Sequence, residues 1–278
     1  QFDSVIIDEA SQLHAAHALP ALLRAKQIII VGDIHQLQPP PIRSDSHNPL
    51  SLLQLALNSP HIPHFSLSMH YRSNHPSLIH SSNELCYQNS LHPIPSPFQK
   101  HNPLSSLTNQ QPQQIEPPQN ASPDQPLKPL GTHVIFSKAQ YSDSRNISEA
   151  QLVSNIACSL MRLYPSMSLG IIASTEAQAS FIENLIDSAR ASSLPIRNFI
   201  NAHSSASSPL FVKTIDEVQG DERDIIIFSL TYSPSATGSG LPKNLGHLSS
   251  PHATNYLNVA LSRASHSTFI VHSIPLPS

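Results

Sequence analysis

Short apolar runs of strand length recur along the chain, separated by longer stretches with the apolar spacing of helices. The strand-like runs are residues 2–7, 27–31, 65–69, 133–136, 169–173, 211–215, 225–229 and 268–272. Several are bulky at successive positions, which is typical of strands buried on both faces of a parallel sheet. The stretches with helical spacing are residues 15–25, 76–87, 148–164, 176–191 and 255–264. This alternation predicts an α/β fold with a parallel sheet flanked by helices.

A polar turn around residue 220 leads directly into the most apolar of these runs. Gln219, Gly220, Glu222 and Arg223 come just before residues 225–229. A glycine in such a turn permits close approach by another backbone or a ligand. The pattern favours a functional loop beside a central strand. The alternative is a surface turn that simply precedes a core strand.

Two carboxylates, Asp8 and Glu9, end the first apolar run. In α/β folds that hydrolyse nucleotides, ligands lie beyond the carboxyl ends of the parallel strands. There Asp8 could hold a magnesium ion, directly or through water, and Glu9 could orient or deprotonate the attacking water. Alternatively, the pair begins a helix, whose N-terminus favours negative charge.

The second apolar run also ends in polar residues, and Gln36 lies among them. If the two runs are neighbouring parallel strands, their polar ends lie on the same edge of the sheet. Gln36 could then sense a terminal phosphate through a hydrogen bond. The alternative is a surface loop that ends at Pro39 and Pro40.

The polar segments resemble, in order, the motifs of superfamily 1 helicases, in the branch of the nonsense-mediated-decay helicase and its bacterial relatives. Motif II is resembled by residues 8–12, motif III by 32–40, motif IV by 70–73, motif IVa by 170–178, motif V by 218–224 and motif VI by 256–264. Six motifs in the family order make the resemblance specific. It covers nearly the whole chain except residues 100–130.

The resemblance implies that ATP binds with Mg²⁺ in a cleft between two RecA-like lobes. Arg72 would reach across the cleft to the γ-phosphate, where a guanidinium neutralises charge on the transferred phosphoryl group. Arg263, expected to be exposed near a helix end, would be a second phosphate contact. Gly220 and Glu222 would border the nucleotide, and Gln219 would lie at the nucleotide or face nucleic acid. Single-stranded DNA or RNA would be the partner.

The same resemblance divides the chain into two parts. Residues 1–60 would be the end of the first RecA-like lobe together with a bridge, and residues 61–278 the complete second lobe. Residues 101–129 are rich in Pro, Gln, Asn and Ser and too poor in apolar residues to order themselves. They are expected to be a low-complexity insertion in the second lobe, partly disordered.

The chain departs from the family pattern in two places. It has no Gly-x-x-x-x-Gly-Lys-Ser/Thr loop, which would cradle the phosphates. Because it also starts at Gln1 and runs straight into a strand, we expect a fragment whose missing partner is the amino-terminal half of the first lobe. Alone it should hydrolyse almost no ATP. In motif VI, Asn255 and Tyr256 replace a basic pair, and Ser265 replaces the last basic residue.

Composition bears on the cellular compartment of the protein but does not indicate its substrate. Charged residues are 12%, against about 25% in typical proteins, and the formal net charge is −3, so no global basic field indicates nucleic-acid binding. Two cysteines form no disulfide framework, which favours the reducing cytoplasm. No apolar run approaches about 18 residues, so the sequence predicts no membrane span.

The leading interpretation is therefore the carboxyl-terminal portion of an ATP-dependent superfamily 1 helicase. The alternative is a non-catalytic RecA-like module, decayed or truncated, that binds nucleic acid or protein. A different P-loop ATPase is disfavoured by Tyr71, Arg72 and Ser73 and by the match to motif VI.

Overall fold

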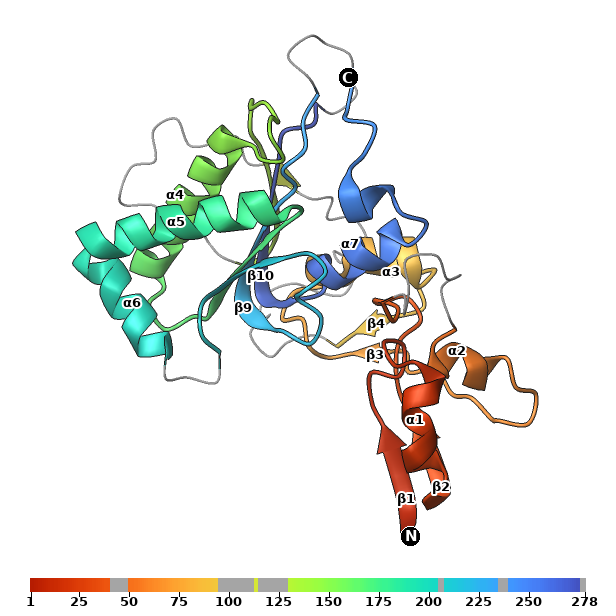
Figure 1. Ribbon diagram of the computed structural model, residues 1–278. Helices are drawn as coiled ribbons and strands as arrows, with labels where there is room; N and C mark the ends of the chain where they lie inside the picture. Colours follow the sequence, from red (N-terminus) through yellow and green to blue (C-terminus); the bar gives the residue numbers. More distant parts are fainter. Residues whose placement is uncertain (41–49, 95–112, 115–129, 205–207, 235–239, 276–278) are drawn as a thin grey trace.

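The computed structural model describes residues 1–40, 50–94, 113–114, 130–204, 208–234 and 240–275. These residues form a large parallel sheet covered by helices and a smaller amino-terminal unit (Figure 1). We call the first the six-stranded unit, residues 69–275, and the second the amino-terminal unit, residues 1–58. The predicted α/β class is confirmed.

All strand pairs in the large sheet are parallel, in the order β5-β6-β10-β9-β7-β8. The strands are β5 (Gln113–Gln114), β6 (Gly131–Phe136), β7 (Leu169–Ala173), β8 (Phe211–Thr214), β9 (Arg223–Ser229) and β10 (Ala264–His272). Ile226 pairs with Thr268 on one side and with Gly170 on the other. The most apolar run of the sequence is thus an inner strand, as predicted.

Helices cover both faces of this sheet, with α4, α5 and α6 on one side and α3 and α7 on the other (Figure 1). Their bounds are α3 (Ser77–Cys86), α4 (Ile147–Leu163), α5 (Glu176–Ser192), α6 (Leu194–Ser204) and α7 (Ala253–Leu261), and a 3₁₀ turn, η2, spans Gly246–Ser249. Successive β9 side chains alternate between the two cores. Ile225 and Ile227 pack toward α4, α5 and α6, whereas Ile226 and Phe228 pack toward α3 and α7. Burial on both faces explains why β9 carries an unbroken apolar run.

The amino-terminal unit has a sheet of two parallel strands, β1 (Phe2–Ile7) and β2 (Ala25–Ile30). Its helices are α1 (Ala15–Leu22) and α2 (Leu52–Leu57), and Ala10, Ala18, Leu52 and Leu53 form its small core. Several large apolar side chains of the unit remain exposed, namely Phe2, Ile6, Leu23, Ile28 and Ile29. A sheet of two strands with few covering elements cannot bury them.

One local expectation was wrong, and one helix was not expected. The run 65–69 is not a strand of the large sheet, because Phe65 and Leu67 are 90% and 88% exposed and only Met69 pairs within it. Strand β3 (Met69–His70) pairs with β4 (His92–Pro93) in a separate sheet of two residues each. Helix α6 was not predicted, although its Ile196 and Phe199 side chains are buried in the core.

The predicted insertion at residues 101–129 lies outside the described residues, apart from β5. Among the described helices, none has the length and apolar character that crossing a bilayer requires.

Candidate functional site

The polar residues that follow β1 and β2 lie on one edge of the small sheet, because the two strands are parallel neighbours. Backbone hydrogen bonds continue past the strand ends, from Val31 N to Ile7 O at 2.8 Å and from Ala10 N to Val31 O at 2.9 Å. A Cβ on Gly32 would lie 3.1 Å from the backbone nitrogen of Ala10. Glycine at this position therefore lets the two polar segments approach closely.

Asp8 and Glu9 form a tight turn directly after β1. The Asp8 Oδ1 accepts a hydrogen bond from the Glu9 N–H at 2.8 Å, and Glu9 has a φ of 52°. A positive φ is uncommon for a residue other than glycine, and such positions cluster at functional sites. Both carboxylates are exposed.

The loop after β2 is folded around the Asp33 carboxylate. Its Oδ1 accepts from the His35 N–H at 2.9 Å, and its Oδ2 accepts from the Gln36 side-chain nitrogen at 3.1 Å. Asp33 thus holds Gln36, the predicted phosphate sensor, on the same edge as Asp8 and Glu9.

The six-stranded unit meets this edge through the loop before β9. Gly220 has a φ of +86°, a conformation that side chains other than glycine rarely adopt. Beside it, Gln219 donates from Nε2 to the Glu9 Oε2 at 3.0 Å and accepts from the Leu37 N–H at 3.0 Å. Gln219 and Glu9, which are 210 positions apart in the sequence, are thereby in contact.

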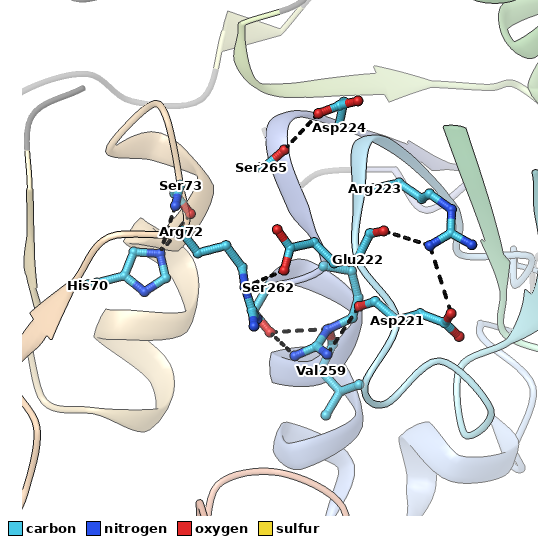
Figure 2. A network of polar contacts seen from close by, with 11 residues as sticks. His70, Arg72, Ser73, Asp221, Glu222, Arg223, Asp224, Val259, Ser262 and Ser265 are labelled. Carbon is cyan, nitrogen blue, oxygen red and sulfur yellow. Dashed lines mark hydrogen bonds and ion pairs between the residues drawn. The ribbon is translucent and has the colours of Figure 1, made fainter. Parts of the chain in front are cut away.

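Arg72 faces the same junction and forms an ion pair with Glu222, with 2.8 Å between the Arg72 Nε and the Glu222 Oε2 (Figure 2). The two side chains are 41% and 45% exposed, so the pair stabilises the fold only weakly. Because the pair is open to solvent, the Arg72 guanidinium is accessible to an anionic ligand. Burial and the nearby Arg72 charge lower the pKa of His70.

The prediction that Arg263 is exposed was wrong, because only 3% of its surface is accessible. Its guanidinium donates to the Val259 carbonyl at 2.8 Å, the Asp221 carbonyl at 3.3 Å and the Ser262 Oγ at 3.0 Å. Burial and then the positive charge of Arg72 lower the pKa of Arg263 to about 10, so it stays charged at neutral pH. A helix end exposes side chains only where no other element covers it, and here the loop before β9 covers it.

Arg223 and Asp224 do not pair with each other, although they are neighbours in the sequence. Asp224 accepts from the Ser168 N–H and hydroxyl, both at 2.8 Å. It also accepts from the Ser265 hydroxyl at 3.2 Å, as Figure 2 shows. Arg223 donates to the carbonyls of Pro209 and Glu222 and lies over the Phe211 ring. Both residues support the loop rather than face the junction.

Sequence reasoning missed a buried carboxylate in the six-stranded unit. Glu149 lies in the first turn of α4 and is fully buried. It accepts hydrogen bonds from the Ser229 hydroxyl at 2.7 Å, the Thr231 N–H at 2.6 Å and the Ser273 hydroxyl at 2.5 Å. Burial raises its pKa, and these donors lower it only in part. The available signal is the Asn-x-x-Glu-Ala pattern of residues 146–150 at the helix start.

The junction thus gathers the predicted residues from two units: Asp8, Glu9 and Gln36 from one, and Arg72, Gln219, Gly220, Glu222 and Arg263 from the other. Within the described part of the chain, no group of three or more His, Cys, Asp or Glu side chains could hold a metal by itself. Magnesium needs no such group, since it is usually bound by one or two carboxylates together with water and substrate phosphates. The exposed Asp8 carboxylate fits that role.

Two protein families together match nearly the whole chain. Residues 49–274 match a family whose description is AAA domain, and residues 1–43 match a second family of the same description. The chain therefore belongs to the AAA-domain family of superfamily 1 helicases, in the branch of the nonsense-mediated-decay helicase.

Several curated relatives align with nearly all of the chain. It is 31% identical to an uncharacterized ATP-dependent helicase of Mycoplasma pneumoniae, over 95% of this chain and 22% of that protein. It is 27% identical to regulator of nonsense transcripts 1 of Dictyostelium discoideum, over 95% and 18%, and 26% identical to ATP-dependent helicase upf1 of Schizosaccharomyces pombe, over 98% and 26%. The chain thus spans only about a fifth to a quarter of the length of these relatives.

Proposed function

We propose that the chain is the carboxyl-terminal part of an ATP-dependent helicase that couples ATP hydrolysis to movement along single-stranded DNA or RNA. The observation that carries this proposal is the junction itself. Two carboxylates and a glutamine on the edge of one sheet lie at a junction with another unit, which carries the exposed Arg72 and the buried Arg263, and the charges of Arg263 and Glu9 interact. Parallel strand ends opposed by guanidinium groups are suited to hold and polarise a nucleotide triphosphate.

Each residue then has a distinct task. Asp8 would hold Mg²⁺, which would supply positive charge against the nucleotide phosphates, and Glu9 would orient or deprotonate the attacking water. Gln36 donates to the terminal phosphate. Arg72 and Arg263 neutralise the charge that develops as the phosphoryl group transfers.

Three residues of the loop before β9 would border the nucleotide. Because Gly220 has no side chain, the backbone of the loop can lie close to the ligand. Glu222 pairs with Arg72 until the nucleotide phosphate takes the place of Glu222 as the partner of Arg72. Gln219 bridges the two units beside the nucleotide. Nucleic acid would bind across both units, gripped alternately as the junction closes and opens.

The proposal includes a phosphate-binding loop from a longer polypeptide, because this chain contains none. The exposed apolar side chains of the small sheet, among them Phe2, Ile6 and Ile28, fit the role of a surface on which the rest of the first lobe packs. We place the protein in the reducing cytoplasm, since Cys86 and Cys158 are free and buried.

The test uses the full-length native protein, with Arg72→Ala as the variant and Arg190→Ala, on the outer helix α5, as the matched control. Wild type is expected to hydrolyse ATP with Mg²⁺, faster when single-stranded nucleic acid is present. Arg72→Ala should slow turnover by roughly 10³-fold, the lower range for loss of such an arginine, while Arg190→Ala leaves it unchanged. Nucleic-acid binding by a wild-type protein that lacks turnover would support the non-catalytic module instead.

A further inference from the structure

Two asparagines of α7 hold three consecutive backbone carbonyls of the loop after β2. Asn255 donates from Nδ2 to the Ile34 carbonyl at 3.0 Å and to the Gln36 carbonyl at 2.7 Å. Asn258 donates from Nδ2 to the His35 carbonyl at 2.8 Å. The loop belongs to the amino-terminal unit and the helix to the six-stranded unit, so all three bonds cross the junction.

The arrangement uses the particular chemistry of asparagine. Residues three apart lie on one face of a helix, so Asn255 and Asn258 both face the loop. Each amide supplies two N–H donors, and carbonyls can only accept. The buried Oδ1 of Asn258 has no partner among the described residues, which is unfavourable for stability. Asn258 therefore contributes at this position through the N–H groups of its side chain, which act as hydrogen-bond donors.

A third residue, Tyr87 at the end of α3, joins the same network. Its hydroxyl donates to the Asp33 Oδ2 at 2.5 Å and accepts from the Asn258 Nδ2 at 2.8 Å. Its ring lies edge-on to His35, with 5.1 Å between the centroids. Burial, and then the Asp33 charge, raise the pKa of Tyr87, so the phenol remains a donor at neutral pH.

These contacts lead to the side chain of Gln36. The Asp33 Oδ2 that accepts from Tyr87 also accepts from the Gln36 Nε2, at 3.1 Å. A continuous chain of hydrogen bonds therefore runs from Asn258 through Tyr87 and Asp33 to Gln36. Leu37, the next residue, is buried in the core between the large sheet and helices α3 and α7.

We propose that Tyr87, Asn255 and Asn258 form a clamp of positioning residues that orients Gln36 toward the nucleotide only while the two units are closed. The proposal rests on the function proposed above and adds a regulation of the same site. Opening of the junction breaks the bonds to residues 33–36 together, and Gln36 then loses its fixed orientation. ATP hydrolysis is thereby confined to the closed state.

The first test is a kinetic cycle in the full-length native protein with Tyr87→Phe, Gln36→Ala and the double variant. Tyr87→Phe keeps the ring beside His35 and removes only the hydroxyl. It is expected to lower kcat by about 10- to 100-fold, as for a misplaced group, with the KM for ATP within about twofold. Tyr141→Phe, away from the junction, is the matched control and should leave kcat unchanged.

The double variant separates a positioning role from a merely structural one. If Tyr87 acts through Gln36, adding Tyr87→Phe to Gln36→Ala lowers kcat no further, whereas independent effects multiply. Multiplying effects, or an unchanged kcat in Tyr87→Phe, would overturn the clamp while leaving the proposed function intact.

A second test needs no activity. Asn255→Asp places a carboxylate against the carbonyls of Ile34 and Gln36 and should speed amide hydrogen exchange across residues 32–38 by at least about tenfold. Asn184→Asp on α5 makes the same charge change elsewhere and should have no effect on that segment. If wild type lacks ATP turnover, the function proposed above fails, and exchange alone decides the clamp. Unchanged exchange in Asn255→Asp refutes it.

Discussion

Gln219 connects the two units through both ends of its side-chain amide. Its Nε2 donates to Glu9 at 3.0 Å, and its Oε1 accepts from the backbone N–H of Leu37 at 3.0 Å. One side chain thus contacts both polar segments that follow β1 and β2. Glu9, the proposed water-activating carboxylate, therefore takes its orientation partly from a residue of the other unit.

Replacing Gln219 by glutamate should be more harmful than replacing it by alanine. Gln219→Glu keeps the acceptor for Leu37 but sets a second carboxylate against Glu9, and like charges in contact disfavour each other. Gln219→Ala only removes the two bonds. In the full-length protein, we expect Gln219→Glu to lower ATP turnover at least about tenfold below Gln219→Ala. Equal rates in a steady-state assay would contradict this role for Gln219.

The Arg72–Glu222 pair should matter little for stability. Both side chains are more than a third exposed, and ion pairs in such positions contribute about 0–1 kcal/mol. Glu222→Gln is therefore expected to change the free energy of unfolding by less than about 1 kcal/mol. Urea titration of the two proteins measures this, and a larger loss would show that Glu222 supports the fold.

Gly170 in β7 should tolerate no side chain while Phe211 is present. A Cβ there would overlap the Phe211 ring and lie 2.9 Å from the Ile226 Cδ1. Overpacking of this kind costs about 1–3 kcal/mol, so Gly170→Ala should lower the free energy of unfolding by that amount. Adding Phe211→Leu should recover part of the loss. A double variant whose losses are simply additive would argue against this contact as the cause.

Glu149 should give the protein a measurable pH dependence. Burial raises its pKa in the folded state above the ordinary value of about 4.3, so the folded protein holds this proton more tightly than the unfolded chain. The resulting stabilisation is present below about pH 4.3 and is lost as pH rises through the folded-state pKa. Stability relative to Glu149→Gln, which does not titrate, should therefore fall over that window.

Urea unfolding of wild type and Glu149→Gln at a series of pH values from 4 to 8 checks this prediction. Because only the difference between the two proteins is used, the titration of other groups cancels. A difference that stays constant, or rises with pH, would mean that the Ser229, Thr231 and Ser273 donors outweigh burial.

The amino-acid pattern by itself determined most of the helices and strands and one edge of the site. The apolar run of β9 indicated burial on both faces, and its side chains alternate between two helical layers. Asp8, Glu9 and Gln36 could be placed on a common edge, because polar residues that end neighbouring parallel strands must meet there.

Only the tertiary structure decided what lies across from that edge. Whether Arg263 is exposed depends on the loop that covers it, and periodicity within α7 carries no information about that loop. The donors around Glu149 come from β9 and from residue 273, far away in the sequence. Tyr87 meets Asp33, and Gln219 meets Glu9, where the loop after β2 buries Leu37 in the core of the six-stranded unit. The short-range pattern of apolar residues indicates which face of a helix or strand is buried. Which residues that face contacts depends on how elements far apart in the sequence pack together.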